Sequence, residues 1–157
     1  MALTLGRRPP AATAAPNAGP RPIAVVLDGS PSSEAALECA VDLARSRCCA
    51  LTLMVMPAWQ PAHVVWCTGA AVVVSTPAAQ AAAAARILAQ AGRAIPPDLV
   101  ISEELVAGPP RDAIRRRLRD GSHQLLVAGR GGVGRAGRRA LRGRGSDGLT
   151  PVLVVSR

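Results

Sequence analysis

The sequence predicts a doubly wound α/β domain, in which an open, mainly parallel five-stranded sheet carries helices on both of its faces. Five short apolar runs alternate along the chain with segments that have helical periodicity. Strands that are apolar throughout are typical of parallel sheets covered on both faces. At 157 residues, of which 49% are hydrophobic, the chain is long enough for one domain with a substantial core.

The domain is expected to occupy residues 23–157, after a flexible tail rich in proline and alanine at residues 1–22. Its first strand is predicted at Ile23–Leu27. The turn that follows contains Ser30, a favourable helix cap, and Pro31, a favourable first helical residue. The helix should bury one face and expose an acidic one. The buried face comprises Leu37, Ala40, Val41 and Ala44, and the acidic face comprises Glu34, Glu38 and Asp42.

The second strand is predicted at Ala50–Met56. A long, apolar, partly ordered loop is expected at residues 57–76, because prolines interrupt it and no clear periodicity appears. A helix is predicted from Pro77 and is strongest over residues 80–91, which are good helix formers. The third strand follows at Leu99–Val106.

A Gly-Pro-Pro turn then leads into the last third of the chain. The elements predicted there are a helix at Arg111–Arg119, a strand at Leu125–Ala128, a weak Arg- and Gly-rich helix at residues 133–144 and a strand at Val152–Val155. In the first of these helices, Ile114 and Leu118 should face inward.

The most informative stretch is the loop after the fourth strand, which contains Gly129, Gly131, Gly132 and Gly134. Glycine lets the backbone approach a ligand and present its N–H groups. Open α/β sheets bind ligands beyond the carboxyl ends of strands, where the strand order reverses. If the first and fourth strands are neighbours, Asp28 and this loop line one crevice suited to phosphates. Two simpler explanations stay open: Asp28 could only hydrogen-bond its own turn, and a coding bias toward glycine could account for the loop.

The spacing of Gly129, Gly131 and Gly134 also matches a dinucleotide fingerprint. Such a fingerprint opens a strand–helix–strand unit and has an acid about 20 residues further on. Only 23 residues follow Gly134, and Asp147 is the sole acid among them. NAD is therefore not the expected ligand.

Positive charge is concentrated near the end of the chain. All 19 cationic residues are arginine. Residues 111–157 contain twelve arginines and only three acids, so their net charge is +9. This equals the net charge of the whole chain. These arginines could clamp phosphates, hold nucleic acid non-specifically, or form a solvated surface. Nucleic acid is the less favoured partner, because residues 130–144 lack aromatic residues for base stacking and no recognition helix is evident.

Several other classes of function lack support. The four cysteines do not have the paired spacing of a zinc site and are expected to be buried or half-buried reduced thiols in a cytoplasmic protein. His63 and His123 have no catalytic partner at a recognisable spacing, so a surface or packing role is expected. No apolar run is long enough to cross a membrane, and no signal peptide is evident.

Residues 25–30, Val-Val-Leu-Asp-Gly-Ser, precede an Ala/Leu-rich helix and resemble the opening of the universal stress protein family. The later match comprises residues 106–110, the helix with Ile114, the strand that leads into residues 129–132, and the final strand after Pro151. The resemblance covers residues 22–157, with a weak stretch at residues 57–76.

This resemblance implies the strand order 3-2-1-4-5 and a homodimer, often formed through the last strand, here Val152–Val155. Family members that bind ATP use an acid after the first strand, a contact from the second strand, and a phosphate motif of Gly, two residues, Gly, nine residues, Gly and Ser or Thr. By resemblance, Asp28 would lie by the adenosine and Met56 near the base. The first half of the phosphate motif corresponds to Gly129, Arg130, Gly131 and Gly132.

The second half of the motif departs from this pattern, because Arg142 stands where glycine is expected and the nearest Gly-Ser pair is Gly145-Ser146.

Two hypotheses about function follow. The first is a cytoplasmic stress-response module that binds nucleotide, with ATP as its ligand, no metal site, at most slow hydrolysis and an unknown protein partner. The alternative is a family-like domain that does not bind ATP and contacts proteins or anions through its Arg-rich last third.

Overall fold

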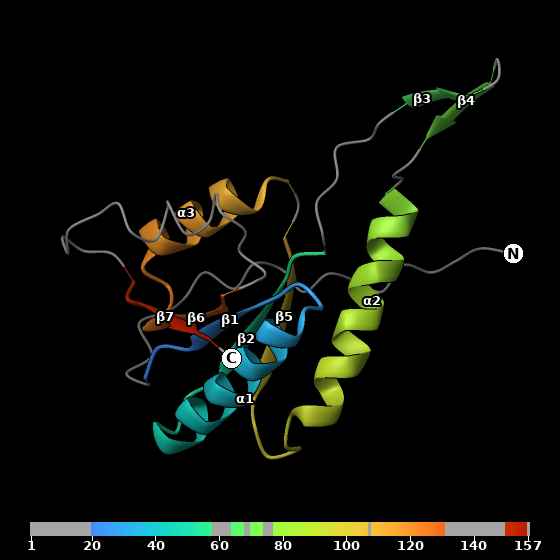
Figure 1. The fold of residues 1–157 in the computed structure, drawn as a ribbon. Helices are drawn as coiled ribbons and strands as arrows, with labels where there is room; N and C mark the ends of the chain where they lie inside the picture. The colour runs from blue at the N-terminus through green and yellow to red at the C-terminus, as the bar shows by residue number, and fades with distance from the viewer. Residues whose placement is uncertain are drawn as a thin grey trace, which may run out of the picture.

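The computed structural model describes residues 20–57, 64–67, 70–73, 77–106, 108–130 and 150–156. Its centre is a five-stranded parallel sheet (Figure 1). The strands are β1 (Ile23–Leu27), β2 (Leu51–Val55), β5 (Ile101–Leu105), β6 (Leu125–Gly129) and β7 (Val152–Val155). They lie in the order β5-β2-β1-β6-β7. Counted within this sheet alone, that is the predicted order 3-2-1-4-5, so the fold class is confirmed.

Within the residues that the structure describes, three helices cover the sheet: α1 (Pro31–Ser46), α2 (Pro77–Ala94) and α3 (Pro110–Asp120). The first begins as the sequence predicts. Ser30 has extended backbone angles and its side chain accepts a hydrogen bond from the N–H of Ser33, while Pro31 is the first helical residue. The acidic side chains of α1 face solvent and its apolar positions are buried, as expected.

The side chains of β1 alternate between two apolar cores. Ile23, Val25 and Leu27 pack with α1 and α2 on one face of the sheet. Ala24 and Val26 pack with α3 on the other face, where Ile114 and Leu118 are buried as predicted. β1 therefore lies at the centre of both cores, and all five of its residues are buried.

The region predicted as a long loop contains two strands, β3 (Val64–Cys67) and β4 (Ala70–Val73). They pair with each other in antiparallel fashion and form a separate ribbon that extends away from the main sheet (Figure 1). The strands are rich in valine, which favours extended structure. The predicted weak helix at residues 133–144 and most of the predicted tail lie outside the described residues.

Position in the sheet decides how far each strand is buried. The edge strand β5 leaves Ile101 and Leu105 exposed, unlike the strands covered on both faces that the sequence predicts.

Among the helices of the described residues, none combines the length and apolar character needed to cross a bilayer.

Candidate functional site

The strand order reverses between β1 and β6, which are parallel neighbours. Val26 of β1 is paired with Ala128 of β6, so the residues that follow both strands emerge at the same edge of the sheet. This confirms the condition on which the predicted crevice depended. Asp28 and Gly129 lie at the edge where open α/β sheets bind ligands.

Asp28 is half-buried and is tied to the turn that starts α1. Its Oδ1 atom accepts hydrogen bonds from the N–H of Ser30, at 3.0 Å, and from the hydroxyl of Ser30, at 2.6 Å. The turn-stabilising role left open by the sequence is therefore present. A carboxylate can accept about four hydrogen bonds, and within the described residues the Oδ2 atom of Asp28 makes none.

Gly129 is buried because the start of α1 rests on it. A Cβ atom at this position would lie 2.3 Å from the carbonyl oxygen of Ser32 and 2.8 Å from the nitrogen of Ser33. Only glycine allows β6 and the first turn of α1 to approach this closely. This packing explains the residue type without a ligand.

Met56 and Arg130 also lie at the carboxyl edge. Met56 is 5% exposed, and its N–H donates to the carbonyl oxygen of Leu27 at 2.8 Å. Arg130 has an exposed side chain, but its N–H donates to the carbonyl oxygen of Val155 at 2.9 Å. This N–H is therefore used in the pairing of β6 with β7. The other predicted site residues, Gly131, Gly132, Gly145 and Ser146, lie outside the described residues.

A pocket of about 290 Å³ lies between α1 and α2, close to the same turn. Leu27, Gly29 and Ile87 contribute to its apolar part, and Glu34 and Glu38 contribute carboxylates. Neither Asp28 nor Gly129 lines it. Its charged lining comprises Glu34, Glu38 and Arg93, and it is therefore a separate hollow from the edge at the ends of β1 and β6.

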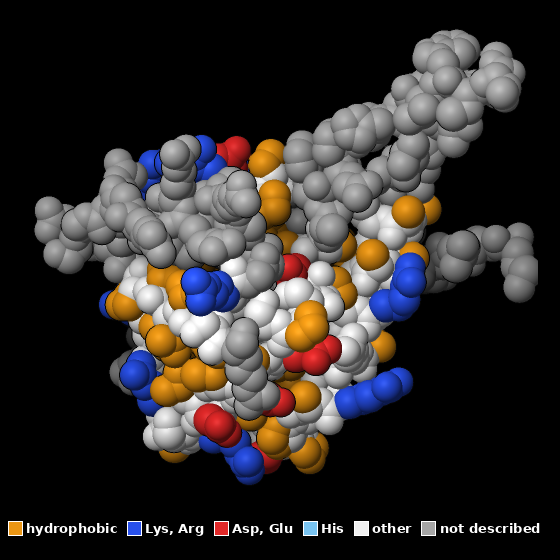
Figure 2. Space-filling model, viewed as in Figure 1, with side chains coloured by type: hydrophobic (Ala, Val, Ile, Leu, Met, Phe, Trp, Pro, Cys, Tyr) orange, Lys and Arg blue, Asp and Glu red, His pale blue; other side chains and the backbone are white. Residues whose placement is uncertain are grey.

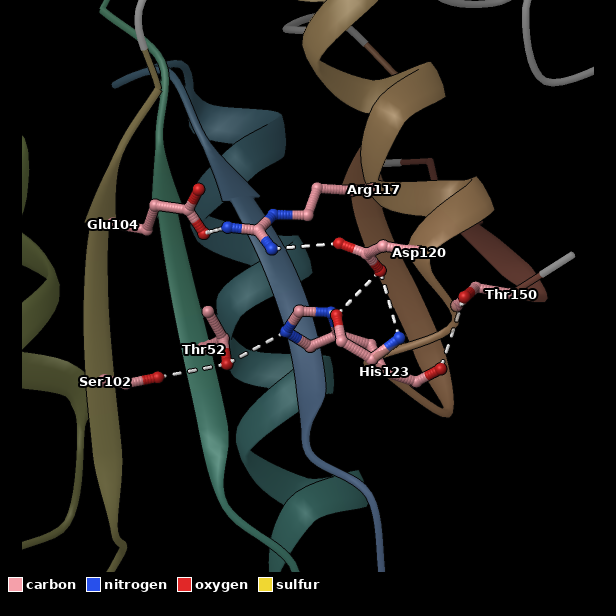
Figure 3. Close-up of polar contacts among 8 residues, drawn as sticks. Thr52, Ser102, Glu104, Arg117, Asp120, His123 and Thr150 are labelled. Carbon is pink, nitrogen blue, oxygen red and sulfur yellow. Dashed lines mark hydrogen bonds and ion pairs between the residues drawn. The ribbon is translucent and has the colours of Figure 1, made fainter. Parts of the chain in front are cut away.

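Sequence reasoning did not identify a polar cluster that lies between α3 and the sheet (Figure 3). At its centre is His123, which is only 6% exposed. The Nδ1 atom of His123 lies 2.8 Å from the hydroxyl of Ser122, and the Nε2 atom lies 3.1 Å from the hydroxyl of Thr52. Thr52 in turn accepts a hydrogen bond from Ser102 at 3.1 Å. A histidine just before a strand, with hydroxyl residues in two other strands, is too diffuse a signal to find from sequence.

The hydrogen bonds determine which nitrogen of His123 carries the proton. Ser122 donates its hydroxyl hydrogen to Asp120 at 2.7 Å, so it accepts from Nδ1–H of His123. The Nε2 atom is then an acceptor for the hydroxyl of Thr52. Because Ser122 donates to Asp120 and not to His123, this group lacks the arrangement of a serine activated by a histidine base.

Charged residues complete the cluster (Figure 3). Arg117 forms ion pairs with Glu104 and with Asp120. Burial would lower the pKa of Arg117, but its hydrogen bonds to both carboxylates raise it. Burial would raise the pKa of Asp120, but hydrogen bonds from Ser122 and Arg117 lower it. Burial and the positive charge of Arg117 lower the pKa of His123, although Asp120 and Glu104 act in the opposite direction. The cluster therefore favours a neutral imidazole.

The described part of the chain contains no group of three His, Cys, Asp or Glu side chains that could hold a metal ion. Of the cysteines in this part, Cys39 is half-buried and Cys49 buried, as predicted, and both are free thiols. Cys48 is also free but is exposed, which corrects the prediction. It has a φ of 51° in the turn after α1, where the backbone turns away from the helix.

The family model described as Universal stress protein family matches residues 20–149. No curated protein sequence matches the chain. Among solved structures, a universal stress protein from Burkholderia pseudomallei is 22% identical with a TM-score of 0.58, over 89% of this chain and 98% of that one. A universal stress protein in complex with cAMP is 24% identical with a TM-score of 0.56, and the match covers 88% of this chain and 98% of that one. A universal stress protein from Archaeoglobus fulgidus in complex with dAMP is 20% identical with a TM-score of 0.55, and the match covers 85% of this chain and 96% of that one.

Proposed function

The chain belongs to the universal stress protein family, and from this we propose that it is a nucleotide-binding module of regulatory type with ATP as its ligand. The observation that supports this most directly is the free carboxylate oxygen of Asp28 at the edge where the strand order reverses. That oxygen can accept hydrogen bonds from the hydroxyl or amino groups of a nucleoside. Solved structures of similar fold contain cAMP and dAMP, which are adenine nucleotides.

The described residues suit the nucleoside part of such a ligand. Asp28 offers a hydrogen-bond acceptor, and Met56 offers a polarisable apolar side chain at the end of the neighbouring strand. For the phosphates we propose the main chain of residues 131 and 132 together with Gly145, Ser146 and the side chain of Arg130. The main-chain N–H of Arg130 is not part of this proposal, because Val155 accepts its hydrogen bond.

A binding role is favoured over a catalytic one. Near Asp28, the described residues offer serine hydroxyls that are already used to cap and close the first turn of α1. The only buried histidine among the described residues, His123, is held by Thr52 and Ser122 in the cluster beneath α3. We propose that nucleotide orders the chain after β6 and that a partner protein recognises the ordered form.

Thermal unfolding with and without nucleotide tests the proposal. At an ATP concentration of 100 times Kd, ligand binding should stabilise the protein by about 2.7 kcal/mol, which raises Tm by about 5–10 °C. AMP and cAMP measured in parallel show how much of the effect comes from the nucleoside. Asp28→Asn is the matched variant, since its amide oxygen can still accept from Ser30 while the free oxygen becomes a donor. Loss of the shift in this variant supports the site, and an absent shift for the wild type at millimolar ATP overturns it.

The second candidate function is an interaction module that does not bind ATP. Two observations favour it: the carboxylate of Asp28 already stabilises its own turn, and Gly129 is explained by the packing of α1. Under this hypothesis the Arg-rich last third contacts an anionic surface or protein. No response to nucleotide, together with salt-sensitive retention on a polyanion, would favour it.

We also propose that the protein is cytoplasmic and forms a homodimer through β7. This strand is at the edge of the sheet, and it leaves Leu153 and Val154 exposed. An exposed apolar edge strand can pair with the same strand of a second copy. Light scattering of the wild type and of Val154→Lys tests this, because a charge on the edge should shift the mass toward the monomer.

A further inference from the structure

The outer surface of α3 carries four arginines: Arg111, Arg115, Arg116 and Arg119. All four are exposed, and within the described part of the chain none of them forms an ion pair or a hydrogen bond. We call this set the α3 arginine face, and arginine side chains gather over α3 at the upper left of Figure 2. Arg117 does not belong to it, because Glu104 and Asp120 neutralise its charge.

This arrangement has an energetic cost in the free protein. Arg111 and Arg115, like Arg115 and Arg119, are four residues apart, and like charges at that spacing destabilise a helix. Arg111 also lies in the first turn, where the helix dipole disfavours a positive charge, and the single carboxylate of Asp112 in that turn offsets only part of the excess. An anionic partner along the helix would remove both penalties.

The length of the α3 arginine face matches an extended polyanion. With a rise of about 1.5 Å per residue, the eight steps from Arg111 to Arg119 span about 12 Å. A nucleic-acid duplex carries one negative charge per about 1.7 Å of its axis, so about seven phosphate charges lie along that distance. Each guanidinium group can therefore reach a phosphate without a fixed register, often with two parallel hydrogen bonds.

Other anionic partners fit less well. A helix that inserts into a membrane interface needs an exposed apolar face, but the apolar residues of α3, Ala113, Ile114 and Leu118, are buried against the sheet, which leaves only the weaker attraction of charges to anionic head groups. Single-stranded nucleic acid requires aromatic side chains for base stacking, and α3 has none. An acidic protein would have to present carboxylates at matching positions, and exposed ion pairs each contribute little.

We propose that the α3 arginine face binds the sugar–phosphate backbone of double-stranded nucleic acid without sequence specificity. Nucleic acid was the less favoured partner because residues 130–144 lack aromatic residues that could stack on bases and because no recognition helix that could contact base edges is evident. Binding to the backbone needs neither aromatic residues nor a recognition helix. This inference does not depend on nucleotide binding at Asp28.

The test measures affinity for a labelled DNA duplex of scrambled sequence over a series of salt concentrations. Each arginine that contacts a phosphate contributes about −0.9 to the slope of log K against log salt, so four contribute about −3.6. The variant Arg111→Gln/Arg115→Gln/Arg116→Gln/Arg119→Gln should lose this amount of slope. Glutamine is nearly as good a helix former as arginine, so α3 should be preserved.

A matched control removes the same charge from the other face of the molecule. Arg45, Arg47, Arg86 and Arg93 are exposed residues of the α1–α2 side, and their replacement by glutamine should leave the slope almost unchanged. Asp28→Asn should bind duplex like the wild type, which separates this inference from the proposed nucleotide site.

Three results would overturn the proposal. Equal loss of slope in the two quadruple variants would show that net charge alone drives binding. Equal affinity of the wild type for the duplex and for polyglutamate of the same charge would point to an acidic protein partner. A wild type that does not bind the duplex at low salt would exclude this function altogether.

Discussion

The Nε2 atom of His123 lies 3.1 Å from the Oγ1 atom of Thr52, and this contact connects the turn after α3 to β2. The hydroxyl of Thr150 donates to the carbonyl oxygen of His123, so the residues before β7 are attached to the same turn. One buried residue, His123, therefore links the turn after α3 and the sheet through its ring and the entry to the last strand through its carbonyl oxygen.

This link should make stability depend on pH. Burial, reinforced by the charge of Arg117, holds the pKa of His123 below its usual value of 6.5. The unfolded chain therefore takes up a proton at a higher pH than the native state does. The stabilisation is fully present above about pH 6.5 and is lost as the pH falls toward the lower native pKa. Asp120, whose pKa is also lowered, adds a loss only below its usual value of 3.8.

Urea unfolding at about pH 7.5 and about pH 5.5 checks this. The wild type should lose stability when the pH falls from about 7.5 to about 5.5, and His123→Gln should lose less, because it lacks the buried imidazole. A wild type whose free energy of unfolding is the same at both values would contradict the neutral assignment of His123.

Replacing Gly129 with alanine should destabilise the protein by about 1–3 kcal/mol or more. The new Cβ atom would lie 2.3 Å from the carbonyl oxygen of Ser32, and backbone atoms on both sides must move. Gly92→Ala is the control: nothing lies within 4 Å of its Cβ position, and it is in the last turn of α2, so it should stabilise by up to about 0.5–1 kcal/mol. Chemical denaturation of both variants gives the comparison, and a neutral Gly129→Ala would refute the close packing.

Ser30→Ala should lower stability by about 1 kcal/mol, within a range of about 0.5–2 kcal/mol, because α1 loses its N-cap. Ser46→Ala removes the same atom at the other end of α1, where the hydroxyl donates to the carbonyl oxygen of Leu43 in an exposed position. That change should stay within about 0.5 kcal/mol. Thermal melts of the two variants should therefore differ clearly, and equal melts would argue against the cap.

Ile114→Ala should cost about 2–5 kcal/mol, because Ile114 is 1% exposed in the core beneath α3 and its loss leaves a cavity. Val100→Ala provides the contrast, since Val100 is 71% exposed and should change stability by less than about 0.5 kcal/mol. If both cost the same in urea titrations, α3 is not packed as described.

The local signals were sufficient for most of the fold. The apolar run at Ile23–Leu27, the cap at Ser30 and the buried face of α1 follow from residue types and spacing, and the structure confirms each. The strand order came from the resemblance and not from these signals. Edge position could not be predicted, so the exposure of Leu105 in β5 was not foreseen. The β3–β4 ribbon was missed because prolines and the lack of polar alternation resemble a loop.

The candidate site was predictable only in part. The meeting of Asp28 and Gly129 at one edge follows from the strand order, and the structure confirms it. The reason for glycine at position 129 depends on where the first turn of α1 lies, which no sequence pattern states. The side-chain partners of His123 are Thr52 in β2 and Ser122 in the turn after α3, and Thr52 in turn bonds to Ser102 in β5, so only the three-dimensional structure brings them together.

At Gly129 no side chain separates the backbone of β6 from the backbone of α1. A layer of side chains could absorb a small displacement by changing rotamers, but two main chains in direct contact are nearly incompressible. Any shift at the end of β6 is therefore transmitted to the first turn of α1 almost unattenuated. The rate of amide hydrogen exchange at Ser33, whose N–H donates to the side chain of Ser30, should therefore change when the chain that follows β6 binds a ligand or moves.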